Sequence, residues 1–116
     1  MNLLEEIESL KMKIVENMKP EATYEYVIAR TYSAGVFAGE LKYRNGKEVE
    51  LLNARRLWSW SGAASLSQLA MEGTSNPENC KFPCEVTSVI LTEVIELLPV
   101  TEKARNSIKG VPIWKS

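Results

Sequence analysis

The sequence predicts an α+β domain: an antiparallel sheet of about four strands with an N-terminal helix, a central helix and a short C-terminal helix. Apolar and polar residues alternate through most of 23–58, a pattern typical of half-buried strands. Helical spacing of apolar residues occurs in 3–18, 62–72 and 101–109. The stretch 85–98 is rich in Val, Ile, Thr and Leu, which favours one further long strand.

Length and composition predict a single domain over residues 1–116, long enough to bury a core. The formal net charge of -1 argues against binding to a DNA or RNA polymer, which needs a basic surface. No apolar run reaches the ~20 residues that span a bilayer, and the acidic start of the chain is unlike a signal peptide. We therefore expect a protein of the cytoplasm, with Cys80 and Cys84 as free thiols.

The chain contains no histidine, which removes the commonest general base and the commonest zinc ligand. Cys80 and Cys84 would supply only two soft metal ligands. An enzyme built from this sequence would have to use carboxylates, lysine or tyrosine. We therefore expect a binding protein rather than an enzyme, with no metal and no cofactor.

The N-terminal helix is predicted over Leu3 to Met18, with Pro20 ending it. Its apolar residues form a narrow stripe at spacings of three and four, and the other face is charged. Such a stripe suits either a contact between two copies of the chain or packing on the chain's own sheet.

The Asn45-Gly46 dipeptide predicts a hairpin between the strands over 36–43 and 49–58. A two-residue loop closed by Arg44 and Lys47 would mix polar and apolar side chains on both faces of the hairpin. A bulged three-residue loop avoids this mixing. We therefore predict the longer loop, with Gly46 at positive φ.

The end of the third strand carries Arg55 and Arg56, which alternation points to opposite faces. One arginine must then lie close to the core, where a buried cation needs an anionic partner. Ser61 is a fair N-cap for a helix that starts at Gly62 and ends at Glu72 before Gly73. Cations next to a helix start suit a nucleotide-like anion; the alternative is a structural corner in the core.

Two further segments carry candidate ligand contacts. Phe82, isolated between Lys81 and Pro83, suits either a core position or a stacking face for a base. The strand predicted over 85–98 is interrupted at Thr92 and Glu93, so a bulge or bend is expected there.

The C-terminal helix is predicted from a Thr101 cap to Lys109, with Gly110 and Pro112 ending it. Arg105 and Lys109 are four residues apart and share one helical face. Such a pair can bind a diphosphate, and the alternative is a solvated basic face.

Several stretches of this chain resemble the Thoeris anti-defence sponges of the first type, a small phage-encoded family. The similarity extends over most of the chain after about Tyr24. The stretches that carry it are Ala54-Arg55-Arg56-Leu57-Trp58-Ser59-Trp60-Ser61-Gly62-Ala63 with Leu66, Ala70 and Gly73, then Cys80-Lys81-Phe82, Glu93 to Pro99, and Thr101-Glu102-Lys103-Ala104.

The resemblance implies a phage protein acting in the host cytoplasm that binds glycocyclic ADP-ribose without cleaving it. TIR-domain proteins make this signal on infection, and its capture keeps it from the Thoeris effector. The resemblance also implies dimers with pockets at their interfaces and assembly of dimers into a hexamer. Separate pockets of the hexamer can hold cyclic oligonucleotides of CBASS defence.

For the ligand site, the resemblance implies Phe82 against the adenine and Thr92 as a polar contact. Arg105 and Lys109, with Asn106 between them, match the basic residues near the C-terminal helix. Lysine departs from an all-arginine pattern, and it meets phosphate as a point charge rather than a bidentate fork. Further candidates for either kind of pocket are Arg55, Arg56, Ser61 and Gly62.

Two other functions remain open. One is an enzyme that degrades a cyclic nucleotide, with Glu72, Glu85 or Glu93 as the base. The other is a small protein-binding module that uses the tyrosines and the N-terminal helix.

Overall fold

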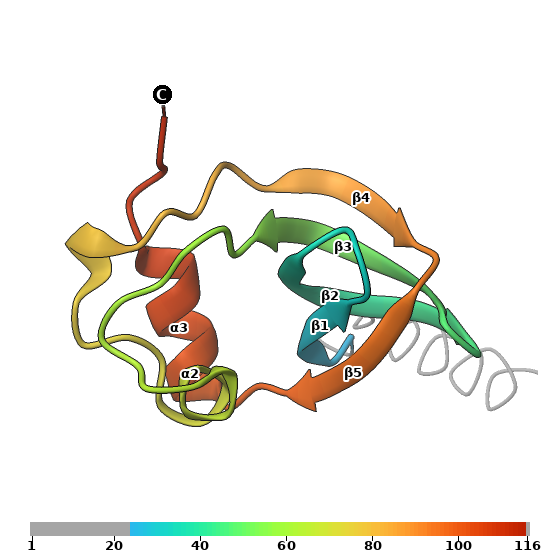
Figure 1. Ribbon diagram of the computed structural model, residues 1–116, viewed down its shortest axis with the longest axis horizontal. Coiled ribbons are helices and arrows are strands. Elements are labelled where there is room, and N and C mark those ends of the chain that lie inside the picture. Colours follow the sequence, from blue (N-terminus) through green and yellow to red (C-terminus); the bar gives the residue numbers. More distant parts are fainter. Residues whose placement is uncertain (1–23, 116) are drawn as a thin grey trace, which may run out of the picture.

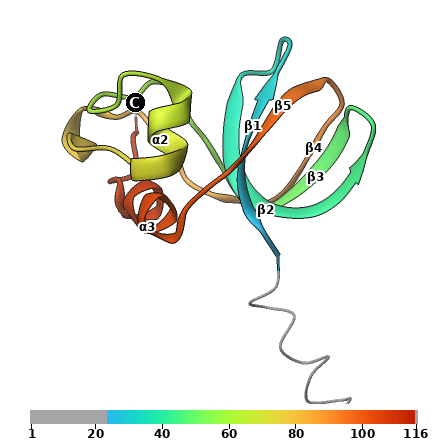
Figure 2. The ribbon, with the colours of Figure 1, turned by 90° about the horizontal axis from the view of Figure 1, so that it is seen from below.

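The computed structural model describes residues 24–115 and is shown from two directions in Figures 1 and 2. The helix predicted over 3–18, and the dimer contact suggested for it, lie outside the described residues. The prediction of an α+β fold with an antiparallel sheet and helices is confirmed. The elements in chain order are β1 (Tyr26–Thr31), β2 (Val36–Asn45), β3 (Glu48–Arg56), α2 (Leu66–Glu72), the 3-10 turn η2 (Pro77–Asn79), β4 (Val86–Leu91), β5 (Val94–Pro99) and α3 (Glu102–Gly110).

The five strands lie in the order β4-β3-β2-β1-β5, and all neighbours are antiparallel. Only Thr92 and Glu93 separate β4 from β5 in the chain, yet these strands form opposite edges of the sheet. In a flat sheet, four spacings of ~4.8 Å would separate the edges, so the sheet must curl, as Figure 2 shows. The bend expected near Thr92 is thus a full corner. The single strand predicted over 85–98 is two strands, and the sheet has five strands instead of about four.

Two bulges bend the pair β2 and β3, because an extra residue in one strand increases local twist. At the first bulge, Asn53 and Ala54 of β3 lie opposite the single residue Gly39 of β2. A Cβ at Gly39 would lie only 3.0 Å from the carbonyl oxygen of Leu52, so a larger residue would crowd the backbone of β3 at this close crossing. At the second bulge, nearer the hairpin, Lys42 is the extra residue of β2.

The hairpin itself has the two-residue loop Gly46-Lys47, closed by the pair Asn45 and Glu48. The predicted three-residue loop is therefore wrong, although the positive φ predicted for Gly46 is confirmed at 61°. A longer loop would add one residue and so shift which side chains share a face of the hairpin. In the structure, the extra residue is Lys42 at the bulge in β2. A bulge within a strand leaves no turn signal in the sequence.

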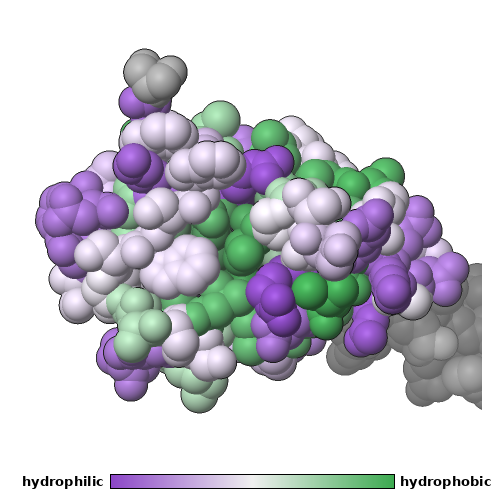
Figure 3. Space-filling model, viewed as in Figure 1, coloured by the Kyte–Doolittle hydropathy of each residue, from purple (hydrophilic) through white to green (hydrophobic). Residues whose placement is uncertain are grey.

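The curled sheet separates two apolar cores. The inner core fills the concave side, and its buried residues are Val27, Ala29, Phe37, Val49, Leu51, Ala54, Leu91 and Val94. The outer core joins the sheet to α2, α3 and the loops beside them, through Tyr26, Ile28, Ala38, Leu57, Leu69, Ala70, Cys80, Phe82, Ile108 and Val111. Because β1 contributes to both cores, it is buried on both faces along most of its length. Figure 3 shows hydrophobic residues gathered between the helical layer and the strands.

Helix α3 follows its prediction closely, and α2 does so only at its end. The Thr101 hydroxyl accepts a hydrogen bond from the Ala104 N–H at 3.1 Å, which caps α3. Gly73, at φ 78°, ends α2 as expected. The cap of α2 is Ser65 rather than Ser61, so this helix begins four residues later than predicted. None of the helices in residues 24–115 is long and apolar enough to cross a membrane.

Candidate functional site

Arg55 is the buried arginine, with 2% of its surface exposed, and its partners are carbonyl groups. Its guanidinium donates hydrogen bonds of 2.7–3.2 Å to the carbonyl oxygens of Phe82, Pro83, Ile108, Val111 and Pro112. The expectation of an anionic partner is wrong, since no carboxylate forms a salt bridge with Arg55 among the described residues. Burial lowers the pKa of Arg55, but an arginine keeps its proton in proteins.

This network gives Arg55 a structural role and removes it from the ligand candidates. The carbonyl oxygens at the end of α3 lack partners within the helix, and Arg55 supplies donors to Ile108 and the two carbonyls just after the helix. The same side chain ties the loop at 82–83 to β3. Its donors point into the protein, so they are not available to a ligand.

Phe82 has no exposed surface and is part of the outer core. Its ring lies 5.5 Å from the guanidinium carbon of Arg55, and its carbonyl accepts a hydrogen bond from the Trp114 N–H at 3.0 Å. Of the two alternatives, the structure therefore has the core position. No face of this ring is open to stack on a base in this conformation.

Arg56 lies on the opposite face, at a shallow groove of about 210 Å³. Its guanidinium lies 4.3 Å above the centre of the Phe37 ring and donates a hydrogen bond to the Ala34 carbonyl. The groove is lined by Gly35, Val36, Arg56, Leu57, Trp58 and Trp60. Arg56 thus borders an open, largely apolar surface, beside which Trp58 is 63% exposed.

Ser61 and Gly62 do not form a helix start, so the anion site predicted from one is wrong. Gly62 has a φ of 81°, outside the helical region, and a Cβ there would lie 2.5 Å from the Asn76 nitrogen. The carbonyl groups of Ser61 and Gly62 accept hydrogen bonds from Thr74 and Ser75. These bonds hold the loop against the segment before η2, and the helix forms only after it.

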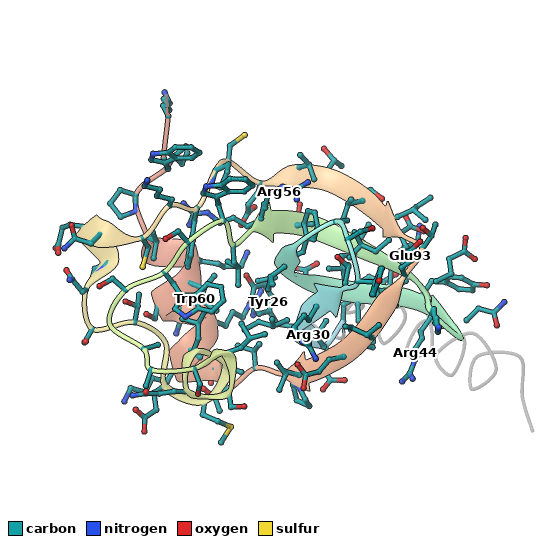
Figure 4. All side chains as sticks on the ribbon, in the orientation of Figure 1. Tyr26, Arg30, Arg44, Arg56, Trp60 and Glu93 are labelled. Carbon is teal, nitrogen blue, oxygen red and sulfur yellow. The ribbon has the colours of Figure 1, made fainter. Side chains whose placement is uncertain are left out.

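Thr92 is exposed at the corner between β4 and β5. This corner lies at the end of the sheet away from α3, as the neighbouring label Glu93 shows in Figure 4. Within one chain, the structure therefore does not bring Thr92 together with Arg105 and Lys109.

Arg105 and Lys109 share one face of α3, as their spacing predicts, and this face lies over β1. The Arg105 guanidinium carbon is 5.5 Å and the Lys109 nitrogen 5.8 Å from the centre of the Tyr26 ring. Figure 4 places Tyr26 between α3 and the strands. Asn106 is exposed and, one residue along the helix, points about 100° away from Arg105.

Two carboxylates face these cations. Arg105 lies 3.6 Å from Glu40 of β2, and Lys109 lies 3.5 Å from Glu85 in the segment before β4. Charge-assisted hydrogen bonds are usually about 2.7–2.9 Å long, so both pairs are loose. The face of α3 that carries Arg105 and Lys109 is therefore not the purely solvated basic face considered from the sequence. It is part of a site that contains both positive and negative charges. We call Tyr26, Glu40, Glu85, Arg105 and Lys109 the Tyr26 cluster.

Two buried polar atoms of the Tyr26 cluster have no hydrogen-bond partner within residues 24–115: the Tyr26 hydroxyl oxygen and Arg105 Nε. Leaving a buried donor unsatisfied costs about 1–3 kcal/mol. Burial raises the pKa of Tyr26, and the nearby Glu85 raises it further. The hydroxyl therefore stays protonated at neutral pH and can donate a hydrogen bond.

The chemistry of the Tyr26 cluster suits an oxyanion. Two cations on one helix face and a neutral phenol can together contact several oxygens of a phosphate group. The sequence pointed to Arg105 and Lys109 but missed Tyr26 and Glu40. These two residues are cross-strand partners in the regular antiparallel register of β1 and β2, so they meet only when the two strands pair.

The carboxylates considered as catalytic bases are spread over the fold. Glu72 ends α2, Glu93 accepts a hydrogen bond from Ser33 at the far corner, and only Glu85 belongs to the Tyr26 cluster. In residues 24–115 no group of three His, Cys, Asp or Glu side chains is placed to hold a metal ion.

Together, these features define a class: a small α+β protein with a curled antiparallel sheet and a polar cluster between β1 and its last helix. The chain belongs to the family described as Domain of unknown function (DUF6948), whose profile matches residues 24–108. The match takes in the whole sheet, α2 and every member of the Tyr26 cluster except Lys109. No curated protein and no solved structure matches the chain.

Proposed function

We propose that this protein binds glycocyclic ADP-ribose without cleaving it and so keeps the signal from the Thoeris effector. The observation that supports this most is the pair Arg105 and Lys109, two cations on one face of α3 above a buried, protonated tyrosine. A pyrophosphate carries its charges on neighbouring groups, and a basic pair one helical turn apart suits that arrangement.

Capture of a signal works by mass action, so the protein must be abundant and bind more tightly than the effector. Nanomolar capture corresponds to roughly -12 kcal/mol. A preorganised site reaches such values with few contacts, because little ordering entropy is lost on binding. All members of the Tyr26 cluster except Glu85 lie on α3 or on the paired strands β1 and β2, which are rigid supports.

In this proposal the complete pocket needs a second copy of the chain. The corner between β4 and β5, which carries Thr92, lies away from α3 in Figures 1 and 2, so Thr92 of one copy meets α3 of another in the proposed dimer. Since Phe82 is buried, an exposed aromatic side chain takes its place against the adenine. The dimers assemble further into a hexamer in the host cytoplasm.

A second pocket for CBASS cyclic oligonucleotides is best placed at the groove beside Arg56. This groove offers one guanidinium and the indole rings of Trp58 and Trp60, a combination that suits bases and phosphates. Arg55, Ser61 and Gly62 have no part in either pocket in this proposal, because their polar groups are used within the fold.

The test is capture followed by release. The full-length protein is incubated with glycocyclic ADP-ribose, freed of unbound ligand and then heated, and the supernatant is analysed by chromatography and mass spectrometry. We expect intact ligand in an amount close to that of the protein. A cleaved product would instead establish the degrading enzyme, with Glu85 as the first residue to replace. If calorimetry detects no binding of any cyclic nucleotide, the protein-binding module becomes the better explanation.

A further inference from the structure

The ion pairs of the sheet differ in how well the carboxylates hold their cations. Arg30 donates a 2.9 Å hydrogen bond to Glu96, which is a close pair. Lys42 lies 3.8 Å from Glu50, but that carboxylate also accepts a 2.8 Å hydrogen bond from Ser88. In the Tyr26 cluster, neither Glu40 nor Glu85 makes a hydrogen bond to its cation, although each is within 4 Å of it.

Glu40 is the less expected of these carboxylates, because its side chain is only 13% exposed. A carboxylate so far out of water normally has several close donors. Around Glu40 the described residues offer the guanidinium of Arg105 at 3.6 Å and the amide nitrogen of Asn53 at 3.5 Å. The paired strands β1 and β2 hold Glu40 here, rather than strong bonds of its own.

Arg105 has unused donors in the same place. A guanidinium carries five N–H groups, and Arg105 Nε is buried without a partner in the described part of the chain. The Tyr26 hydroxyl is a second buried group without a partner. The site thus combines cations that are loosely paired with donors that are not used.

We propose that Glu40 and Glu85 are internal counterions, which an anionic ligand must displace from Arg105 and Lys109. This proposal rests on the function proposed above only in the choice of anion, a diphosphate. Two neighbouring phosphoryl groups can replace both carboxylates at once, whereas a single phosphate group, even as a dianion, replaces one and remains repelled by the other. Displacing the two carboxylates costs binding free energy that a diphosphate recovers at both cations and a single phosphate recovers at only one. The carboxylates therefore favour diphosphates over single phosphates.

The test uses inorganic pyrophosphate as the probe, with orthophosphate as the singly phosphorylated comparison, in calorimetry at low salt. Replacing Glu40 by Gln keeps the shape of the side chain and removes its charge. We expect E40Q and E85Q each to bind pyrophosphate about 10-fold more tightly than the wild type. Their preference for pyrophosphate over orthophosphate should shrink at the same time.

The matched control is E96Q, which neutralises a carboxylate of a close ion pair on the same sheet. It should leave pyrophosphate affinity unchanged. Adding R105A to E40Q should abolish the gain, because the released cation is then missing. Glu85 is more exposed than Glu40, so E85Q still tests the proposal if E40Q fails to fold.

The results separate the two proposals. Unchanged or weaker pyrophosphate binding by both E40Q and E85Q would overturn the counterion role, even if the protein captures glycocyclic ADP-ribose. A gain in both variants supports the counterion role, even if the wild type fails to capture the cyclic nucleotide. An equal gain in E96Q would also overturn it, because the effect would then be one of net charge alone.

Discussion

Two arginines are associated with α3 in different ways: Arg55 is bonded within the fold, and Arg105 belongs to the proposed ligand site. Arg55 reaches the end of α3 from β3 and donates hydrogen bonds to five carbonyl groups. Arg105 lies on α3 and faces β1, and within residues 24–115 it has one loose salt bridge and a buried nitrogen without a partner. The hydrogen-bond donors of Arg55 are used within the fold, whereas Arg105 keeps donors for the ligand proposed above.

The two side chains differ in burial, since Arg55 is 2% exposed and the Arg105 side chain 43%, although Nε of Arg105 is buried. The number and length of the hydrogen bonds distinguish them. The donors of Arg55 are buried and directed at the chain, so a ligand cannot reach them, whereas an arginine beside a displaceable carboxylate has donors within reach. Of the paired Arg55 and Arg56 in the sequence, Arg55 is used within the fold, whereas Arg56 stays a candidate at the groove that it lines.

The largest effect is expected for Arg55→Ala. Several buried carbonyl groups would lose their donors, and we expect the free energy of unfolding to fall by about 3 kcal/mol or more. Arg55→Lys should recover only part of this loss, because an ammonium cannot reproduce the planar fork. Urea denaturation measures both, with the exposed Arg30→Ala as the control. A loss no larger than that of the control would mean that Arg55 is not a structural arginine.

Arg105→Ala should have little effect on stability and a large effect on ligand binding. We expect stability to change by less than about 1 kcal/mol, since a partly exposed, loose pair contributes little. Capture of glycocyclic ADP-ribose should weaken by about 10-fold or more. Lys103→Ala, which removes a charge from another face of α3, is the matched control in calorimetry. Equal losses in the two variants would place the phosphate site elsewhere.

Alkaline pH offers a third comparison, through Tyr26. Burial raises its pKa in the folded protein, so the unfolded chain loses the proton first, near the ordinary value of 10.0. The contribution of the protonated Tyr26 to the free energy of unfolding is complete below that pH. It is lost as the pH rises toward the pKa of Tyr26 in the folded protein. Above pH 10, we expect wild-type stability to fall relative to Tyr26→Phe by up to about 1.4 kcal/mol per pH unit. Parallel curves for the two proteins would show that Tyr26 ionises as freely folded as unfolded.

The smallest effect is expected for the same variant at neutral pH. Removing an unpartnered buried hydroxyl should change stability by less than about 1 kcal/mol, and the change can be an increase. Pyrophosphate binding should weaken by only a few-fold, since one neutral donor is lost. Thermal unfolding and calorimetry measure the two effects. A large loss of stability would reveal that the Tyr26 hydroxyl has a partner essential to the fold.

The sequence predicted features that depend on neighbouring residues. The Thr101 cap, the glycine after α2, the positive φ of Gly46 and the shared face of Arg105 and Lys109 all arise within a few residues. Ser61 failed as a cap because tertiary hydrogen bonds from Thr74 and Ser75 fix its loop in another conformation. These long-range hydrogen bonds outweigh the local propensity of Ser61 to cap a helix.

The Tyr26 cluster depends on pairings between distant segments. Tyr26 and Glu40 meet through the β1–β2 register, and Glu85 meets Lys109 only after the sheet has curled. The spacing of these residues along the sequence does not predict either contact. Phe82 shows the same limit, since its position suited both a core and a surface role until the chain around it was placed.

The pairing of β1 with β5 also determines the order in which the protein can be assembled. Arg30 and Glu96 are 66 residues apart, so β1 has only one strand partner until the chain has been made past β5. Contacts of such long range slow folding. Until β5 arrives, the edge of β1 offers unpaired backbone groups to other chains. A nascent chain that stalls between β3 and β5 therefore exposes an edge of β1, the strand that the finished fold buries on both faces along most of its length, and misassembly should be greatest during that interval of synthesis.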